Sequence, residues 1–385
     1  MDEKIGIWFI GARGSLATTA TLGLHGLASR LAAPTGCVTE LDDLDGRGLP
    51  AYDRLVTGGH DVSDLPLTKR AEQLVAGGVV SSALVEALGG ELAAADDRVR
   101  PGADADTDQR GTVERLTADI VHFRERMGLD RVVVVDVSST EPPHDPGPDA
   151  ATWASLQGAW DAGRTPLTPS SVYACAALLA GCSYVGFTPS PGIDIPALRE
   201  LADREGLPYA GRDGKTGETL VKSALAPMFA TRALPIRSWT SINLLGGGDG
   251  QTLADPVAAA SKTDTKQASL DAIVGAPVDG PMHIDYLEDL GDWKTAWDHV
   301  RFDGFLGARM TLQFTWQGCD SALAAPLVLD LVRLVARAHA LGDAGALSAL
   351  GFFFKAPLAS DEHRLPAQWD ALRTWARDCA DRATS

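Results

Sequence analysis

Lysine is scarce in this sequence, and the places where it occurs are the first sign of chemistry. Of the 34 lysine and arginine residues, 8 are lysine, and 6 of these lie in the C-terminal half. Arginine carries surface charge equally well but keeps its proton near neutral pH, whereas a partly buried lysine can release it. The pattern favours compact, titratable amines, against the alternative that each lysine is a solvated helix residue left by coding bias. The six are Lys215, Lys222, Lys262, Lys266, Lys294 and Lys355.

A glycine turn near the N-terminus is typical of a phosphate-binding site. The apolar run at 4–10 predicts a strand, residues 11–15 (GARGS) a turn, and residues 16–33 a helix. Backbone N–H groups of such a turn, together with the helix N-terminus, bind the pyrophosphate of a dinucleotide. The match to G-x-G-x-x-G is partial, because only Gly11 and Gly14 are present and no acidic residue closes a second strand at the expected distance.

The segments that follow predict the scaffold for these groups. The β-branched run at 131–137 predicts a strand buried on both faces of a parallel sheet, and 184–187 and 208–210 predict further strands. Helices are predicted at 171–181 and 196–205. Polar residues directly after such strands, as at 138–142 and 188–190, line the ligand crevice of doubly wound folds. Residues 87–112 are expected to form a solvated loop without chemistry.

Beyond residue 212 the pattern changes. Strict alternation at 310–317 predicts a half-buried strand, and 236–245 and 283–287 predict two more, which indicates a mixed sheet. Residues 320–340 predict a long helix that returns to the first domain. The predicted fold class is α/β, with a Rossmann-like doubly wound domain of residues 1–212 and 321–385. A second α+β domain with a mixed sheet, residues 213–320, is inserted before the C-terminal helices and is assigned catalysis and oligomerisation.

The bulk properties restrict the partners. A chain of 385 residues with 45% hydrophobic and 22% charged residues is expected to be a folded protein of two domains. The net charge of -17 argues against nucleic-acid and membrane partners, so a phosphorylated ligand must meet a local basic pocket. Five cysteines without C-x-x-C spacing predict buried, reduced thiols, and the lack of a basic leader and of an 18-residue apolar stretch predicts a cytoplasmic protein.

Six blocks of residues, in order along the chain, resemble the myo-inositol-1-phosphate synthase family. They are residues 211–219, 241–250, Ser261-Lys262 with Lys266, 291–294, Cys319-Asp320-Ser321 with the Leu-Ala-Ala-Pro that follows, and 354–357. The glycine turn and residues 58–63 and 139–141 are similar to the family's cofactor segments. No single block is decisive, but six in register over roughly 150 residues are hard to obtain by chance.

The resemblance implies an isomerase that uses NAD for an intramolecular aldol cyclisation without net redox change. Most directly, glucose 6-phosphate would become 1L-myo-inositol 1-phosphate, also named the 3-phosphate. Carbon 5 is oxidised, the enolate at carbon 6 attacks the aldehyde at carbon 1, and the ketone is reduced again. Every step moves a proton and builds negative charge on oxygen, which ammonium groups stabilise. The residues implied as catalytic are Lys262, Lys294, Lys355, Lys266, Asp213 and Asp320.

The resemblance also assigns roles and binding residues. Lys262 and Lys355 would transfer protons at the oxidised carbon, and Lys294 and Lys266 would serve the aldehyde oxygen and the phosphate. The substrate would contact Thr216, Gly217, Asn243, Lys266 and Lys294. NAD would contact Gly11, Ala12, Arg13, Gly14, Ser15, Asp61, Ser139, Thr140, Thr188, Asp213, Gly247, Asp249, Asp320 and Ser321. No dedicated metal site is implied, an activating cation is left open, and a homotetramer or homodimer is expected.

Two positions depart from the family and leave other functions open. Glycine occupies positions 247 and 248, where the family pattern leads us to expect asparagines, so two side-chain amides are missing. A related cyclase that converts fructose 6-phosphate to a five-membered carbocycle is the main alternative. A simple NAD-dependent dehydrogenase would accumulate NADH, and an inactive NAD-binding homologue would not need the lysines. Each aspartate is also acceptable as a helix cap or turn residue.

Overall fold

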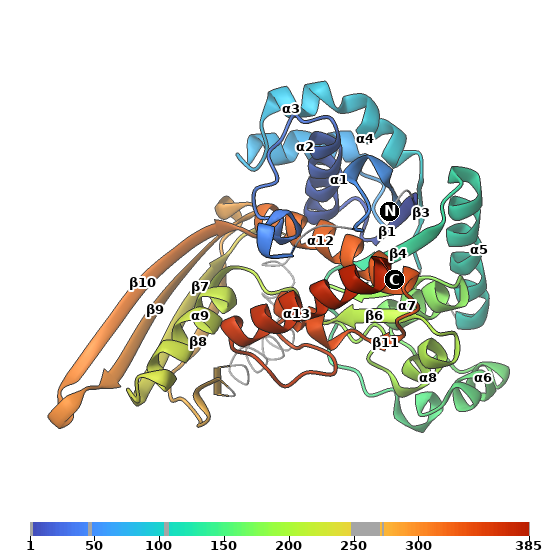
Figure 1. Ribbon diagram of the computed structural model, residues 1–385. Coiled ribbons are helices and arrows are strands. Elements are labelled where there is room, and N and C mark those ends of the chain that lie inside the picture. The colour runs from blue at the N-terminus through green and yellow to red at the C-terminus, as the bar shows by residue number, and fades with distance from the viewer. Residues whose placement is uncertain (1–2, 45–47, 104–107, 248–269, 272, 385) are drawn as a thin grey trace.

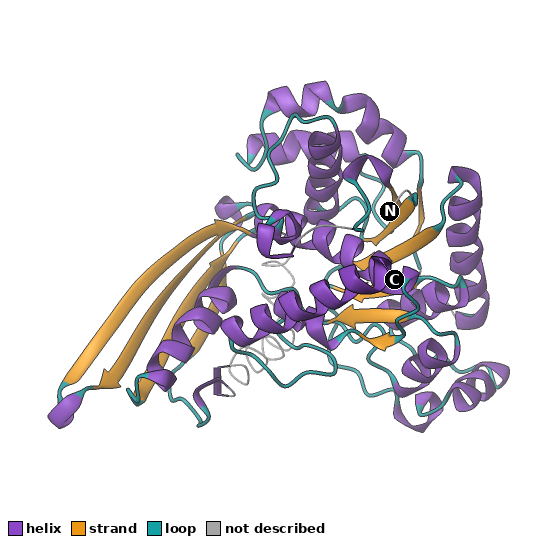
Figure 2. Cartoon of the chain, viewed as in Figure 1, coloured by secondary structure: helices purple, strands orange, loops and turns teal. Residues whose placement is uncertain are grey.

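The computed structural model of the chain contains two β-sheets, each covered by helices (Figures 1 and 2). The structure describes residues 3–44, 48–103, 108–247, 270–271 and 273–384. The larger sheet has seven strands and the smaller has four. The smaller sheet extends away from the larger unit as a long, curved blade. The predicted fold class, a doubly wound parallel sheet and a second region with a mixed sheet, is confirmed.

In the larger sheet, neighbouring strands are parallel and follow the order β11-β6-β5-β4-β1-β2-β3. The chain runs from β1 outward to β3 and then returns to the other side of β1. The topological switch point therefore lies between β1 and β4, where doubly wound folds bind ligands at the carboxyl edge. The strands are β1 (Ile5–Ile10), β2 (Leu55–Asp61), β3 (Val99–Pro101), β4 (Arg131–Asp136), β5 (Ser183–Gly186), β6 (Pro208–Gly211) and β11 (Gly345–Ala346).

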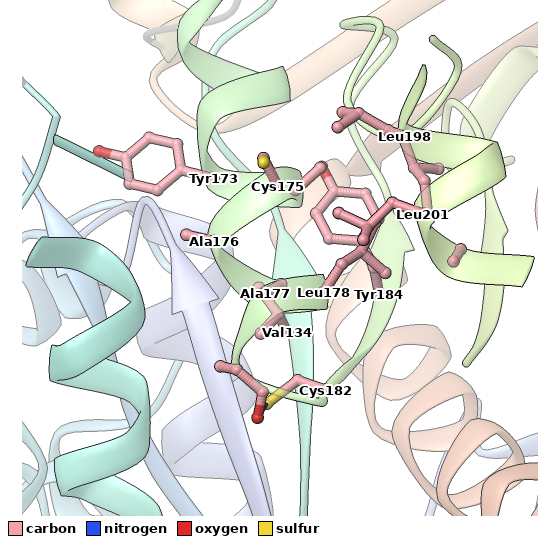
Figure 3. Close-up of a cluster of buried hydrophobic side chains, with 14 of the residues drawn as sticks. Val134, Tyr173, Cys175, Ala176, Ala177, Leu178, Cys182, Tyr184, Leu198 and Leu201 are labelled. Carbon is pink, nitrogen blue, oxygen red and sulfur yellow. Dashed lines mark hydrogen bonds between the residues drawn. The ribbon is translucent and has the colours of Figure 1, made fainter. Parts of the chain in front are cut away.

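Helices cover both faces of this sheet, so its central strands are apolar throughout. Trp8 and Val134 point into a cluster with α5 and α7, whereas Phe9 and Val135 point into a cluster with α1 and α12. Figure 3 shows part of the first cluster, where side chains of α7 meet Val134 and Tyr184. The helices are α1 (Ser15–Ala28), α5 (Gln109–Met127), α6 (Trp153–Asp161), α7 (Pro169–Leu179), α8 (Pro196–Arg204), α12 (Asp320–Ala340) and α13 (Leu365–Thr384).

Three short helices, α2 (Leu67–Ala76), α3 (Ser82–Ala87) and α4 (Gly89–Asp96), pack on α1 beside the β3 edge. The prediction of a solvated loop at 87–112 is therefore wrong, because this stretch contains α4, β3 and the start of α5. Alanine gives α4 a high helix propensity, and Leu92 and Ala95 bury its one apolar side among α1 and α2. So few apolar residues leave almost no periodic signal in the sequence.

The smaller sheet has the order β10-β9-β7-β8, with β7 and β8 parallel and the other pairs antiparallel. Helix α9 covers one face, where Phe229 packs with Trp239 and Val300. The alternation at 310–317 gives one row of side chains toward this core and one exposed row. The elements are β7 (Ile236–Leu245), β8 (Met282–Tyr286), β9 (Trp293–Asp303), β10 (Arg309–Cys319) and α9 (Gly217–Thr231).

Helix α12 links the two sheets. It follows β10 directly and packs on α1, β4, β5 and β6, as the sequence predicts. Its buried Asp330 accepts a hydrogen bond from the N–H of Val38 at 2.6 Å and thereby fixes the connection between α1 and β2. All five cysteines are buried and free of disulfides. No helix in the described part of the chain has the length and apolar character to span a membrane.

Candidate active site

The glycine turn lies at the switch point of the large sheet. Gly11 follows β1 with a φ of +83°, and a Cβ atom there would lie 3.1 Å from the Cα of Ser138 after β4. Only glycine combines this backbone conformation with so close an approach of two chains. Gly14 is the N-cap of α1. The N–H groups in the first turn of a helix have no partner within it, so α1 offers an anion-binding terminus at this crevice.

The first amides of the turn are already engaged within the protein. The N–H groups of Gly11 and Ala12 both donate to the carbonyl of His60, at 3.0 and 3.1 Å. Of the five turn residues, Gly14 and Ser15 line the cleft. The start of α1, rather than the turn before it, therefore faces the ligand crevice.

Asp61 is the acidic residue at the end of a second strand that the sequence spacing did not reveal. It ends β2, and its carboxylate accepts hydrogen bonds from the N–H of Arg13 at 2.6 Å and the N–H of Ser63 at 2.7 Å. The side chain of Arg13 turns to Asp96, with Nε 2.9 Å from Oδ1. The long connection after α1, residues 29–54, moves Asp61 far beyond the usual spacing from the glycine turn.

A cleft of about 340 Å³ runs from the start of α1 to the second sheet. Its walls carry segments that directly follow β4, β5, β6 and β7, together with the N-terminus of α12. This placement at the carboxyl edge of a parallel sheet is the position expected for a ligand. The predicted site residues in its lining are Gly14, Ser15, Ser139, Thr140, Thr188, Asp213, Thr216, Gly247, Lys294, Asp320, Ser321 and Lys355.

Two segments that lie far apart in the sequence pair to place Lys355 beside Asp213. Arg212 and Ala356 exchange backbone hydrogen bonds of 2.9 and 3.2 Å, and the N–H of Lys355 donates to the carbonyl of Asp213 at 2.7 Å. The Nζ of Lys355 then lies 2.8 Å from the Asp213 carboxylate. Both side chains are buried, at 8% and 4% exposure. A lysine held this way is oriented and shielded from water, as an acid–base group requires.

A second lysine–aspartate pair lies in the same cleft. Lys294, at the start of β9, forms an ion pair with Asp320, the first residue of α12. The other oxygen of Asp320 accepts a hydrogen bond of 3.4 Å from the hydroxyl of Thr216. The helix dipole of α12 favours the carboxylate at this terminus. Asp320 thereby connects a lysine of the second sheet with the start of α9.

The cleft continues into a narrower pocket between the start of α9 and the second sheet. Thr216, Gly217 and Asn243 line it, together with Lys294 and Lys355 from the cleft. Thr216 is the N-cap of α9, so the first N–H groups of this helix are available to an anion.

Thr219 also lines this pocket, and the sequence analysis did not single it out. Its side chain is 4% exposed, and its hydroxyl has no hydrogen-bond partner within the described residues. A buried polar group without a partner is costly, which points to a ligand that supplies one.

A buried carboxylate supports the floor of the cleft. Asp136, at the end of β4, accepts hydrogen bonds from the N–H and hydroxyl of Ser138 at 3.0 and 2.7 Å, and from the hydroxyl of Tyr184 at 3.0 Å. Burial raises the pKa of Asp136 to about 6. The network fixes the segment that carries Ser139 and Thr140 along the cleft.

Several predicted residues lie elsewhere. Lys262, Lys266 and Asp249 lie outside the described residues, as does Gly248. Gly11, Ala12, Arg13 and Asp61 lie behind the first turn of α1 and not in the cleft lining. His60, to which the sequence assigns no site role, is fully buried and accepts a hydrogen bond from the indole of Trp8 at 2.9 Å. Within the described residues, no group of three or more His, Cys, Asp or Glu side chains could hold a metal ion.

The cleft contains further residues that sequence reasoning missed. Arg70 of α2 and Asp292 before β9 both line it. Ser138 lines the cleft as well, in agreement with the prediction for the polar segment 138–142. Arg70 had no signal in the sequence, since arginine is abundant in this chain and only the packing of α2 on α1 brings it to the cleft.

These features define a class of protein: a two-sheet α/β protein whose dinucleotide crevice opens onto a pocket with two lysine–aspartate pairs. The open helix terminus of α1 and the close backbone approach at Gly11 fit a dinucleotide. Comparison with known proteins identifies the family. A family model described as myo-inositol-1-phosphate synthase, and named as NAD-binding, matches residues 5–377.

Curated and solved relatives agree with this match. The chain is 30% identical to inositol-3-phosphate synthase 1 of Bacteroides thetaiotaomicron over 410 aligned residues, which cover 97% of this chain and 95% of that protein. The crystal structure of inositol-3-phosphate synthase from Caenorhabditis elegans matches with a TM-score of 0.86 at 22% identity, over 99% of this chain and 86% of that one. A myo-inositol-1-phosphate synthase-related protein from Thermotoga maritima matches with a TM-score of 0.77 at 23% identity, over 98% and 99%.

The chain belongs to the myo-inositol-1-phosphate synthase family, a family of NAD-using, isomerase-type enzymes. The resemblance carried by the six sequence blocks is therefore confirmed.

Proposed function

We propose that this protein converts glucose 6-phosphate to 1L-myo-inositol 1-phosphate by NAD-dependent oxidation, enolisation, aldol ring closure and reduction. The observation that carries the proposal is the pair of lysine–aspartate contacts, Lys355 with Asp213 and Lys294 with Asp320, in one cleft beside a dinucleotide crevice. An ordinary dehydrogenase needs a single acid–base group at the oxidised carbon. A cyclisation needs charge and protons at two carbonyl positions.

NAD, when bound, supplies the acceptor for a hydride and later returns it. Lys355, in its uncharged form, accepts the proton of the hydroxyl at carbon 5, and Lys262 accepts the proton that leaves carbon 6. The two ammonium groups then stabilise the enolate oxygen, and Lys355 returns its proton to that oxygen when the ketone is reduced. Asp213 holds the Lys355 amine in place through the 2.8 Å contact. Lys294 donates to the aldehyde oxygen at carbon 1 as its negative charge develops, while Asp320 orients Lys294.

The substrate phosphate is placed at the start of α9. The N–H groups in the first turn of α9 and the hydroxyl of Thr219 supply donors there. The hydroxyl of Thr216 joins them when it exchanges its 3.4 Å bond to Asp320 for one to the phosphate. Lys266 is assigned to the same phosphate by resemblance to the family. Residues 213–320 then form the catalytic and oligomerisation domain, and residues 1–212 with 321–385 the NAD-binding domain, in a homotetramer or homodimer.

One observation favours a second substrate. Gly247 lines the cleft with a φ of +65°, and a Cβ atom there would lie 3.3 Å from the Asp292 carboxylate. Without the amide expected from the family pattern, the pocket has fewer hydrogen-bond groups and more room. A substrate whose acceptor carbonyl lies at carbon 2, such as fructose 6-phosphate, would be accommodated by this change and would give a five-membered carbocycle.

The test is to incubate the protein with NAD and either sugar phosphate, identify the product by NMR, and follow absorbance of the reduced nicotinamide. We expect a carbocycle and no net accumulation of NADH, because the hydride returns to the product. Steady accumulation of NADH with an oxidised, open-chain sugar would indicate a simple dehydrogenase. Lack of reaction with both sugar phosphates would disprove the proposed cyclisation.

A further inference from the structure

Arg70 presents a positive charge to the cleft beside the first turn of α1. It lies on α2 and lines the cleft together with Gly14 and Ser15. Its Nε donates to the carbonyl oxygen of Arg13 at 3.1 Å, and its Nη1 donates to the side-chain oxygen of Gln73 at 2.8 Å. Both acceptors are neutral, so these bonds orient the guanidinium without cancelling its charge.

The other cations in the described cleft lining are already balanced. Lys355 is paired with Asp213 and Lys294 with Asp320. Asp292 adds a further negative charge to the same wall. In a chain with a net charge of -17, an anionic ligand at the α1 end of the cleft needs a local cation, and Arg70 is placed to supply it.

Helix α2, which carries Arg70, is fixed at both ends. At its start the N–H of Leu67 donates to the Asp96 carboxylate at 3.4 Å. At its end the carbonyl of Gly77 accepts a hydrogen bond of 2.8 Å from the indole of Trp293, the residue before Lys294. Figure 1 places α2 directly beside α1. A cation fixed before the ligand arrives loses little conformational entropy on binding.

We propose that Arg70 is a cofactor-binding residue whose guanidinium contacts the pyrophosphate of the dinucleotide, opposite the N–H groups at the start of α1. Arginine suits this role because its planar fork donates two parallel hydrogen bonds to phosphate oxygens. The inference rests on the proposed use of NAD and adds a contact that the resemblance to the family does not assign. The side chain of Arg13, in the turn itself, is paired with Asp96. Arg70 therefore takes the phosphate-binding role that a basic residue of the turn would otherwise have.

The experiment measures binding of NAD, ADP and adenosine to the full chain by calorimetry, without sugar phosphate. For Arg70→Ala we expect about 10- to 100-fold weaker binding of NAD and of ADP, the range for a lost charge-assisted hydrogen bond, and unchanged binding of adenosine. Arg70→Lys should give an intermediate loss. Lys69→Ala is the matched control, because Lys69 is the neighbouring residue on α2, pairs with Glu72 and does not line the cleft.

The outcomes separate this inference from the proposed function. An NAD affinity of Arg70→Ala equal to that of Lys69→Ala would overturn the role of Arg70 while NAD use stands. An equal loss for adenosine and ADP would also overturn it, because the effect would then come from a disturbed fold. If Arg70→Ala fails to fold, two measurements replace it. They are the NAD affinity of Arg70→Lys, which should lie below that of the wild type, and the NAD affinity of the wild type, which should fall as salt is added. No binding of NAD by the wild type would instead refute the proposed function.

Discussion

At the scale of single residues, Lys355 beside Asp213 could act either as a fixed positive charge or as an amine that gives up and takes back a proton. Lys355 is 8% exposed and forms its ion pair inside the cleft. A buried pair of this kind is weak evidence for stability, because desolvation of both charges offsets their attraction. Its burial at a cleft fits the proposed acid–base role, which needs an amine that can both accept and donate a proton.

Replacement of Lys355 by arginine tests this role directly. Arg keeps the positive charge beside Asp213 but cannot release its proton near neutral pH. We expect Lys355→Arg and Lys355→Ala to lower kcat for carbocycle formation alike, by about 10²- to 10⁴-fold, with NAD binding retained. Lys4→Arg is the control, since Lys4 precedes β1 and donates to the carbonyl of Met127 at the edge of the sheet opposite the cleft. Substantial activity in Lys355→Arg would contradict a proton-transfer role and leave only a role for charge.

The sequence revealed some residues of this site and not others, for physical reasons. Asp213, Lys294, Asp320 and Lys355 were identified because their neighbours form recognisable blocks, and the chain brings all four to one cleft. Arg70 could not be identified, since its position depends on how α2 packs on α1.

At the scale of elements, helix α13 is hydrogen-bonded to the paired backbone segments that carry Asp213 and Lys355. Lys215 is 4% exposed, and its amine donates to the side-chain oxygen of Gln368 on α13 and lies 5.8 Å from the centre of the Phe352 ring. The amide of Gln368 donates in turn to the carbonyl of Glu362 at 2.5 Å. Burial lowers the pKa of Lys215 to about 7.

This lowered pKa predicts a pH dependence of stability. Between pH 7 and 10.5 the folded state holds Lys215 neutral, while the unfolded chain keeps it protonated with a pKa near its ordinary value of 10.5. The unfolded state binds more protons, so the free energy of unfolding should rise with pH across this window, by up to about 1.4 kcal/mol per pH unit. Below pH 7 both states are protonated and this contribution is flat.

Urea denaturation of wild type and Lys215→Met between pH 6 and pH 10 measures this term. Met has a similar volume and no charge, so the difference in free energy of unfolding between the two proteins should change with pH above about 7. The lost hydrogen bond to Gln368 adds a constant that does not depend on pH. Lys69→Met is the control, because the Lys69 side chain is exposed, and its free energy of unfolding should follow a curve parallel to that of the wild type. A parallel curve for Lys215→Met would contradict a neutral Lys215.

The elements differ in how far the sequence determines them. Strand β4 was predictable because burial on both faces requires a continuous apolar run, and β10 because one exposed face requires alternation. Helix α1 ends at Ala28, earlier than the predicted residue 33, because Arg30 adopts a left-handed φ of +60°. Helix α4 was missed because only two of its side chains are buried. Tertiary packing, rather than local pattern, decided these two cases.

At the scale of the whole molecule, the second sheet has an outer face that no described helix covers. Helix α9 covers the inner face of the second sheet, whereas Trp297 lies between Ile242 of β7 and Thr315 of β10 on the outer face. At the tip of the β9–β10 hairpin, Phe305 and Leu306 are 86% and 90% exposed. Figure 1 shows this blade extending away from the rest of the chain. Exposed apolar groups on an extended sheet are typical of a surface that another subunit covers.

We therefore expect the protein to assemble through this face, in agreement with the proposed homo-oligomer. Trp297→Glu would place a charge at its centre, where burial against a partner would cost several kcal/mol, and should reduce the mass measured by light scattering to that of one chain. Gln157→Glu on α6 adds the same charge to an exposed position on the first sheet's helices and should leave the assembly intact. A Trp297→Glu protein with the wild-type mass would place the subunit contact on another surface. A single-chain mass for the wild type would show that the outer face has no partner copy.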